Sequence, residues 1–126
     1  MTLTITGGYA AALTVLFLIL STRVIIHRRG QKVSLGTGGD PVLEQKIRAQ
    51  GNFAEYAPLG VILLAIAELQ GHAAVWLHLV GGLLLVGRLA HGVNFSFGLR
   101  KMVLRVGGML LTLTALALGA LLALPL

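Results

Sequence analysis

Four long apolar segments, separated by short polar connections, dominate this sequence. They cover about residues 5–26, 41–69, 73–95 and 102–124. A helix needs roughly 20 apolar residues to cross the hydrocarbon core of a bilayer, so each segment is long enough for one crossing. Of the 126 residues, 56% are hydrophobic and only 11% are charged, whereas soluble domains carry about a quarter charged residues. The sequence therefore predicts an all-α integral membrane protein, with one four-helix bundle formed by residues 1–126.

The basic residues gather in two of the connections between these segments. The first and third connections hold Arg28, Arg29, Lys32, Arg100 and Lys101. The short second connection and both ends of the chain hold no Lys or Arg. The positive-inside rule then places both basic connections in the cytoplasm and both termini on the opposite side. The net charge of +6 is explained by this topology, and a nucleic-acid partner, which would need a basic face on a soluble module, is not expected.

A polar stripe begins the second apolar segment. Glu44, Arg48, Asn52 and Glu55 project within about 80° of one another at 100° per helical residue. Ionisable groups at membrane depth are costly and persist where they face a bundle interior or a wet cavity. The stripe is therefore the main candidate for a binding site. Because the chain has no cysteine, it offers no thiolate metal site, and any thiol chemistry would use the thiol of a ligand.

The stripe resembles a known signature. Its matching residues are Glu44, Arg48, Ala49, Asn52, Glu55, Tyr56 and Pro58. In this pattern the chain is similar to the membrane-associated proteins in eicosanoid and glutathione metabolism, the MAPEG family. Residues 28–34 resemble the first loop of that family, and Arg88 with His91 resembles its prostaglandin synthase branch. The likeness covers nearly the whole chain and is greatest to a short bacterial branch of the family.

The resemblance implies a homotrimer in a bacterial inner membrane. Glutathione would bind between neighbouring subunits near the cytoplasmic face, and an apolar electrophile would reach it from the lipid. The implied activity is that of a glutathione transferase or peroxidase.

The resemblance also implies the residues that would contact glutathione. These are Arg28, Arg48, Asn52, Glu55, Tyr56 and His91. Arginine suits a carboxylate because its planar fork binds both oxygens, and asparagine can donate and accept at once. Each also has a purely structural interpretation. Arg48 could pair within its helix, Asn52 could link helices, Arg28 could only set topology, and His91 could be a packing residue.

The resemblance further implies a cation at the start of the fourth segment that stabilises the glutathione thiolate. Arg105 is the candidate for this catalytic role, and Arg100 and Lys101 are its competitors. The eicosanoid branches of the family place a tyrosine before this arginine, where the present chain has Phe95. This departure favours an alternative, a non-catalytic protein that keeps the fold and uses the stripe as a structural network. A small transporter is the remote alternative, because such exporters need a carboxylate in their first helix and residues 5–26 contain none.

Several packing expectations complete the prediction. We expect Arg88 to pair with Glu55 or Glu44 across two helices, and Glu68 and His72 to be solvated at the opposite membrane face. Small residues let membrane helices approach closely. We expect this of five glycines in the third and fourth segments, Gly81, Gly82, Gly87, Gly107 and Gly108.

Overall fold

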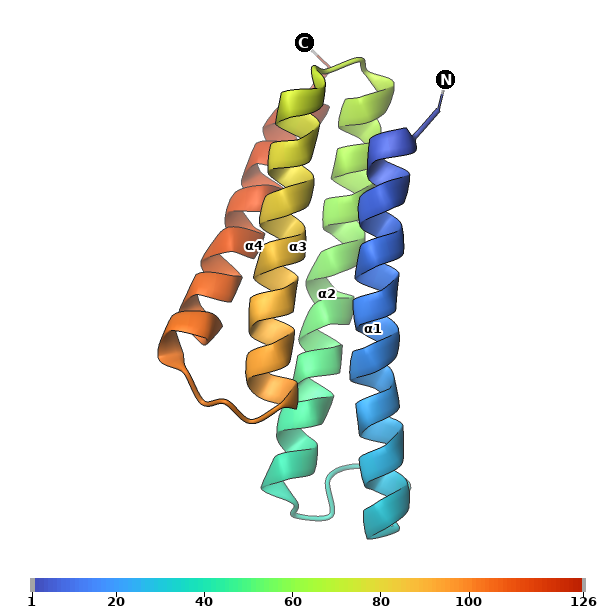
Figure 1. Cartoon of the computed structure of the whole chain (residues 1–126), viewed down its shortest axis with the longest axis vertical. Coiled ribbons are helices and arrows are strands. Elements are labelled where there is room, and N and C mark those ends of the chain that lie inside the picture. Colours follow the sequence, from blue (N-terminus) through green and yellow to red (C-terminus); the bar gives the residue numbers. More distant parts are fainter. Residues whose placement is uncertain (1, 126) are drawn as a thin grey trace.

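The structure is a computed structural model that describes residues 2–125. It contains four helices, α1 (Thr4–Gln31), α2 (Pro41–Leu69), α3 (Ala74–Ser96) and α4 (Met102–Ala123). They run alongside one another in alternating directions, so the start of α1 and the end of α4 lie at the same end of the bundle (Figure 1). All four are long and apolar enough to cross a membrane. We call the end with residues 32–40 and 97–101 the loop end, and the end with residues 70–73 the turn end.

The first helix is longer than its apolar segment. Residues 27–31 were expected to be a connection, but α1 continues through them to Gln31. Hydropathy marks where a helix leaves lipid, and nothing requires the helix to stop there. Arg28 and Arg29 lie in the last turn, where cations interact favourably with the helix dipole. Lys32 then ends the helix in the left-handed conformation, with φ of 55°.

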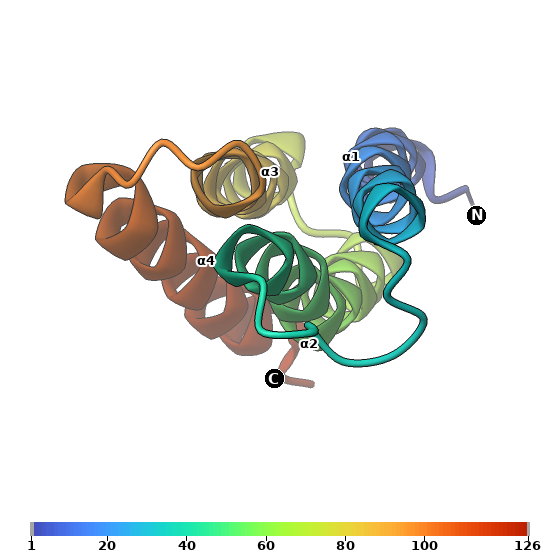
Figure 2. The same cartoon turned by 90° about the horizontal axis from the view of Figure 1, so that it is seen from below.

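The two middle helices hold the bundle together. Both α2 and α3 contact every other helix, whereas α1 and α4 make no close approach to each other within residues 2–125. Viewed from the loop end, α1 and α4 flank the α2–α3 pair on opposite sides (Figure 2). The larger apolar core, centred on Leu20, Phe53 and Leu84, lies where α1, α2 and α3 meet. This arrangement leaves one side of α2 facing α1 and another side facing α4.

The closest helix approach joins α3 to α4. A Cβ on Gly87 would lie 2.7 Å from Thr112 Oγ1 and 2.8 Å from the Gly108 carbonyl, and one on Gly108 would lie 2.9 Å from the Gly87 carbonyl. Gly81 is equally crowded, against the ring of Tyr9. Gly82 and Gly107 have no atom within 4 Å of such a Cβ. The expectation of close approach is therefore confirmed for Gly81, Gly87 and Gly108 and is wrong, within this subunit, for the other two.

Glu68 caps a helix that has no cap of its own. The residue before α1, Leu3, provides no side-chain acceptor. Instead Glu68 of α2 accepts hydrogen bonds from the backbone N–H groups of Ile5 (2.9 Å) and Thr6 (3.0 Å). His72 lies 2.7 Å from the carbonyl of Leu122 through Nε2. Glu68 and His72 both stay partly exposed at this end of the bundle. Each in addition binds backbone groups that the helix ends leave unpaired.

Asp40 is the N-cap residue of α2 at the loop end. Its Oδ1 accepts from the N–H groups of Val42 (2.9 Å) and Leu43 (3.2 Å), as the Asp-Pro sequence predicts. Its Oδ2 lies 2.7 Å from Nε2 of His27 on α1, and Nδ1 of His27 lies 3.0 Å from the ammonium of Lys46. Because an ammonium only donates, Nδ1 accepts and Nε2 donates to Asp40. The hydrogen bonds from His27 and from the Leu43 backbone lower the pKa of the Asp40 carboxyl.

We expect Gly87→Ala to destabilise the protein, because its methyl group would collide with backbone atoms of α4. Overpacking of this kind costs about 1–3 kcal/mol. The matched control is Gly82→Ala, which meets nothing within 4 Å and should be neutral or stabilising by up to about 1 kcal/mol. Thermal unfolding in detergent measures both variants. Equal effects of the two substitutions would contradict the close α3–α4 approach.

We expect the stabilisation by Asp40 to depend on pH. A carboxyl with a lowered pKa stabilises the folded state fully above its ordinary value of 3.8, and this contribution is lost as the pH falls through the lowered value. Asp40→Asn keeps the capping oxygen but cannot ionise. Wild type should therefore unfold at a higher temperature than Asp40→Asn at pH 7, and the difference should shrink below pH 3.8. Glu44→Gln, in the same helical turn, is the control and should show a smaller difference; a gap for Asp40→Asn that stays constant at every pH would contradict the prediction.

Candidate functional site

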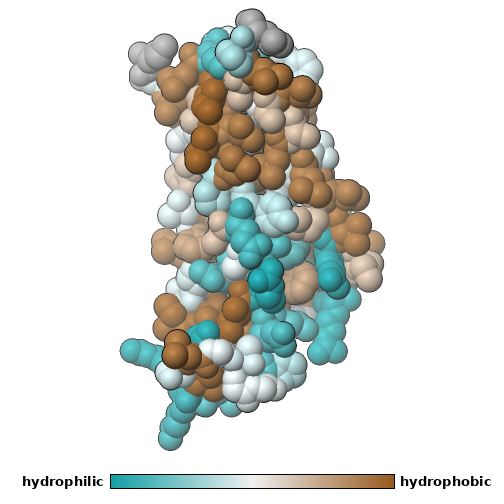
Figure 3. Space-filling model, turned by 180° about the vertical axis from the view of Figure 1, so that it is seen from behind, coloured by the Kyte–Doolittle hydropathy of each residue, from teal (hydrophilic) through white to brown (hydrophobic). Residues whose placement is uncertain are grey.

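A groove between α2 and α4, with α3 as its floor, contains the main candidate residues. Its volume is about 320 Å³, and it is lined by Arg48, Asn52, His91, Phe95, Arg105 and Met109. We call it the polar groove. A second hollow shares Phe95 and Arg105 with it and continues toward the loop end, where it is lined also by Gln45, Asn94, Arg100, Lys101 and Met102. We call this part the mouth. Viewed from behind, the molecule gathers its hydrophilic surface in the lower half, toward the loop end, beneath an apolar upper half (Figure 3).

Arg88 lies under the polar groove and is 1% exposed. Its guanidinium donates to the side-chain and backbone oxygens of Asn52, at 2.5 and 3.1 Å, and to Oγ1 of Thr112 at 3.0 Å. It also contacts the Met109 sulfur at 3.3 Å. The expected pairing with Glu55 or Glu44 was wrong: within residues 2–125, no carboxylate lies within ion-pair distance of Arg88. Oxygen atoms of an amide and a hydroxyl satisfy its donors without neutralising its charge.

Arg48 and Glu55 form the ion pair of the stripe. Their charged atoms lie 3.6 Å apart, and the side chains are 54% and 56% exposed, so the pair contributes little to stability. Arg48 lines the polar groove, whereas Glu55 does not. Glu44 lies in the first turn of α2 and is exposed. Of the four stripe residues, the groove thus contains Arg48 and Asn52, with Glu55 beside them.

His91 of α3 forms part of the floor of the groove. It is 5% exposed and stacks on Phe95, with ring centroids 4.6 Å apart. Its Nδ1 is buried and has no hydrogen-bond partner among the described residues. Buried polar atoms are normally paired, so this nitrogen is available to a ligand or to an ordered water.

Arg105 spans the groove and its mouth. Its guanidinium carbon lies 5.6 Å from the centre of the Phe95 ring. Arg100 and Lys101, the competing cations, line only the mouth. Geometry therefore favours Arg105 for a role beside His91. Phe95, at the expected tyrosine position, provides the ring on which both residues rest.

Tyr56 and Arg28 lie outside the polar groove. The ring centre of Tyr56 is 5.4 Å from the guanidinium carbon of Arg88, so it supports that residue. Arg28 donates to the carbonyl of Gly36 at 2.7 Å and lines a separate hollow at the end of α1. Since α1 does not approach α4 in the described chain, one subunit does not bring Arg28 to Arg105.

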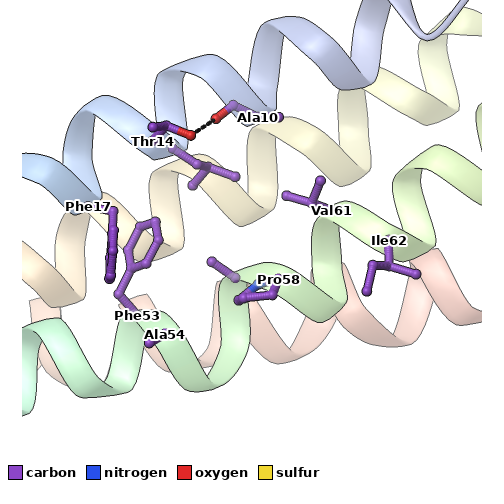
Figure 4. Close-up of a pocket in the computed structure, with 10 residues that line it drawn as sticks. Ala10, Thr14, Phe17, Phe53, Ala54, Pro58, Val61 and Ile62 are labelled. Carbon is purple, nitrogen blue, oxygen red and sulfur yellow. Dashed lines mark hydrogen bonds between the residues drawn. The ribbon is translucent and has the colours of Figure 1, made fainter.

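An apolar groove lies on the other side of α2. It has a volume of about 380 Å³ and is lined by Ala10, Leu13, Thr14, Phe17, Phe53, Ala54, Ala57, Pro58, Val61 and Ile62. Figure 4 shows its residues extending from α1 and α2 toward one another, with the rings of Phe17 and Phe53 side by side. Thr14 provides the one polar side chain among these lining residues. Its hydroxyl donates to the Ala10 carbonyl at 2.8 Å, so its proton is not free to bind a ligand. The surface suits an apolar chain.

Sequence reasoning missed the residues that α4 contributes beside Arg105. Met109 lines the polar groove and Thr112 accepts from Arg88. Their spacing of four and seven residues from Arg105 puts all three on one helical face, and this signal could have identified them. Gln45 and Asn94, which line the mouth, carry no comparable signal.

Comparison with known proteins identifies the family of this chain. The model of the MAPEG family matches residues 6–125. The chain belongs to the MAPEG family. This MAPEG protein is also 34% identical, over 110 residues, to inner membrane protein YecN of Escherichia coli strain K12, a match that covers 87% of this chain and 82% of the relative. The same protein of Escherichia coli O6:H1 strain CFT073 matches equally well. The sequence-based resemblance is thereby confirmed, and the protein is a membrane protein of this family.

Proposed function

We propose that this MAPEG protein binds glutathione in the polar groove and transfers its sulfur to apolar electrophiles. The observation that carries the proposal is the charge of the groove. Arg48 and Arg105 line it together with Asn52 and His91, Arg100 and Lys101 follow at the mouth, and no Asp or Glu is among these lining residues. A site of this kind suits a peptide-like anion with two carboxylates.

The residues present fit the functional groups of glutathione. Arg48 offers a planar fork for one carboxylate, and Glu55, 3.6 Å from Arg48, offers an acceptor for the amine. Tyr56 supports this region through Arg88. Arg105 and His91 line the part of the groove that we assign to the sulfur. A cation beside a thiol lowers its pKa and favours the reactive thiolate, which is the catalytic role proposed for Arg105.

The proposed reaction needs little covalent chemistry from the protein. Arg105 stabilises the sulfur after its proton leaves to water at the mouth. The sulfur lone pair then forms a bond to the electrophilic carbon, and the leaving group departs with the electrons of its bond. With a peroxide, the thiolate attacks the terminal oxygen and becomes a sulfenic acid, while the alkoxide leaves and takes a proton from water to become the alcohol. The thiol of a second glutathione then attacks the sulfenic sulfur, and the disulfide and water are released. Positioning and a depressed thiol pKa supply most of the acceleration.

We include a homotrimer in the proposal because, within one subunit, the residues required for the reaction lie on opposite sides of α2. Arg28 and the apolar groove belong to the α1 side of α2, whereas the polar groove lies on its α4 side. A ring of subunits, each presenting its α4 side to the α1 side of the next, would bring them together. The apolar groove would then hold the lipophilic substrate beside the sulfur.

We also propose an inner-membrane location with both termini outside the cytoplasm. The relative is named an inner membrane protein, and the basic residues of both long loops lie at one end of the bundle. The polar groove opens at that same end, which is where cytoplasmic glutathione would enter.

Calorimetry on the detergent-purified protein tests the ligand. We expect saturable glutathione binding that weakens at least tenfold in Arg48→Ala, because one carboxylate loses a charged bidentate partner. Arg29→Ala is the control, since it removes an equal charge from an exposed position outside the polar groove. Absence of wild-type binding at millimolar glutathione would overturn the proposal. Binding without any conjugation of 1-chloro-2,4-dinitrobenzene would identify the non-catalytic alternative.

Subunit complementation tests the trimer. We expect Arg28→Ala and Arg105→Ala each to lose conjugation of 1-chloro-2,4-dinitrobenzene by at least tenfold when expressed alone. If each site combines Arg28 and Arg105 from neighbouring subunits, co-expression should restore about a quarter of the sites in randomly mixed rings. The control is a mixture of Arg48→Ala with Arg105→Ala. Both residues line the polar groove of the same subunit, so every groove in the mixture lacks one of them and should stay inactive. Failure of the first mixture to recover activity would argue against sites between subunits.

A further inference from the structure

Asn52 and Arg88 form a hydrogen-bonded pair beside the centre of the polar groove. Arg88 is the most deeply buried charge near the groove, at 1% exposure. Its Nη1 donates to both oxygens of Asn52, and its Nε donates to Thr112. Asn52, unlike Arg88, lines the groove and is only half-buried.

The orientation of the Asn52 amide follows from the chemistry of its neighbour. A guanidinium carries donors and no acceptor, so Asn52 must present its Oδ1 to Arg88. The flipped amide would set N–H groups against N–H groups. The amino group of Asn52 is therefore directed away from Arg88, and it donates to no group of residues 2–125.

Arg88 is held firmly enough to impose this orientation. Thr112 uses its own proton on the carbonyl of Gly108, at 2.8 Å, so its hydroxyl oxygen can only accept from Arg88. The Met109 sulfur and the Tyr56 ring contact the guanidinium from other directions. The guanidinium is fixed by α2 and α4 at once, and Asn52 adapts to it.

We propose that Arg88 is a positioning residue that makes Asn52 a hydrogen-bond donor to the groove, so that the centre of the site selects an acceptor group. A carboxylate or an amide carbonyl meets this requirement, and an amine does not. Arg48 and Arg105 line the same groove and favour the same choice by charge. The identification of the ligand as glutathione rests on the proposed function, whereas the selection of an acceptor does not.

The variant Asn52→Asp separates the two hydrogen-bonding roles of this side chain, which are accepting from Arg88 and donating to a ligand. Its carboxylate can accept from Arg88 as the amide oxygen does, but it offers no N–H to a ligand. We expect the unfolding midpoint in detergent to rise by roughly 3 °C or more, because the buried cation gains a counter-charge. We expect glutathione binding, measured by calorimetry, to weaken at least tenfold. The control is Gln50→Glu, which makes the same change of charge at a position that lines neither the groove nor its mouth and should alter neither quantity.

A probe without a thiol makes the test independent of glutathione. Succinate should raise the unfolding midpoint of the wild type and of Gln50→Glu but not of Asn52→Asp. The diamine of equal length, 1,4-diaminobutane, should not raise the midpoint of the wild type.

The outcomes are distinct. A midpoint lowered in Asn52→Asp would overturn the orientation, and unchanged succinate binding in that variant would overturn the donor role. If the wild type responds to succinate and not to glutathione, the proposed function fails and the selection of an acceptor stands.

Discussion

Arg88, a buried arginine with no carboxylate partner among residues 2–125, connects three of the helices. Arg88 of α3 donates to Asn52 of α2 and to Thr112 of α4, and it also contacts Met109. A cation inside a membrane bundle is costly, and these contacts satisfy its hydrogen bonds without neutralising it. Thr112 reaches Arg88 because Gly87 and Gly108 allow α3 and α4 to approach closely. The packing of α3 on α4 and the position of the Arg88 charge beneath the polar groove therefore depend on the same contact.

The two ends of the bundle are built differently. At the turn end, side chains bind the unpaired backbone groups of the helices, as Glu68 does for α1 and His72 for α4. At the loop end, Arg23 joins α1 to the last turn of α3 through Ser96, at 2.7 Å, and stacks on Phe97. No such tie joins α1 to α4 in the described chain. The polar groove and its mouth lie between α2 and α4 toward this end of the bundle.

Membership in the MAPEG family explains the fold and the pattern along α2, but activity depends on the side chains of the groove itself. Phe95 illustrates the point. At a position where related branches were expected to have a tyrosine, its ring stacks on His91 and lies under Arg105. It has no hydroxyl to give to a sulfur, so the polar groups at this depth are those of Arg105 and of His91, whose Nδ1 has no partner among residues 2–125.

The sequence by itself determined the four helices, the start of α2 at Asp40 and the grouping of Arg48 with Asn52. These features follow from local patterns, since hydropathy, capping and helical spacing act over one or two turns. It did not determine where α1 ends, because leaving the lipid does not end a helix. The partners of Arg88, the cap that Glu68 provides and the exclusion of Glu55 from the groove were decided by the tertiary structure alone. Each of these three features depends on which faces of two or three helices meet. The close packing of Gly87 against Gly108 and the position of α2 between its neighbours decide which faces those are.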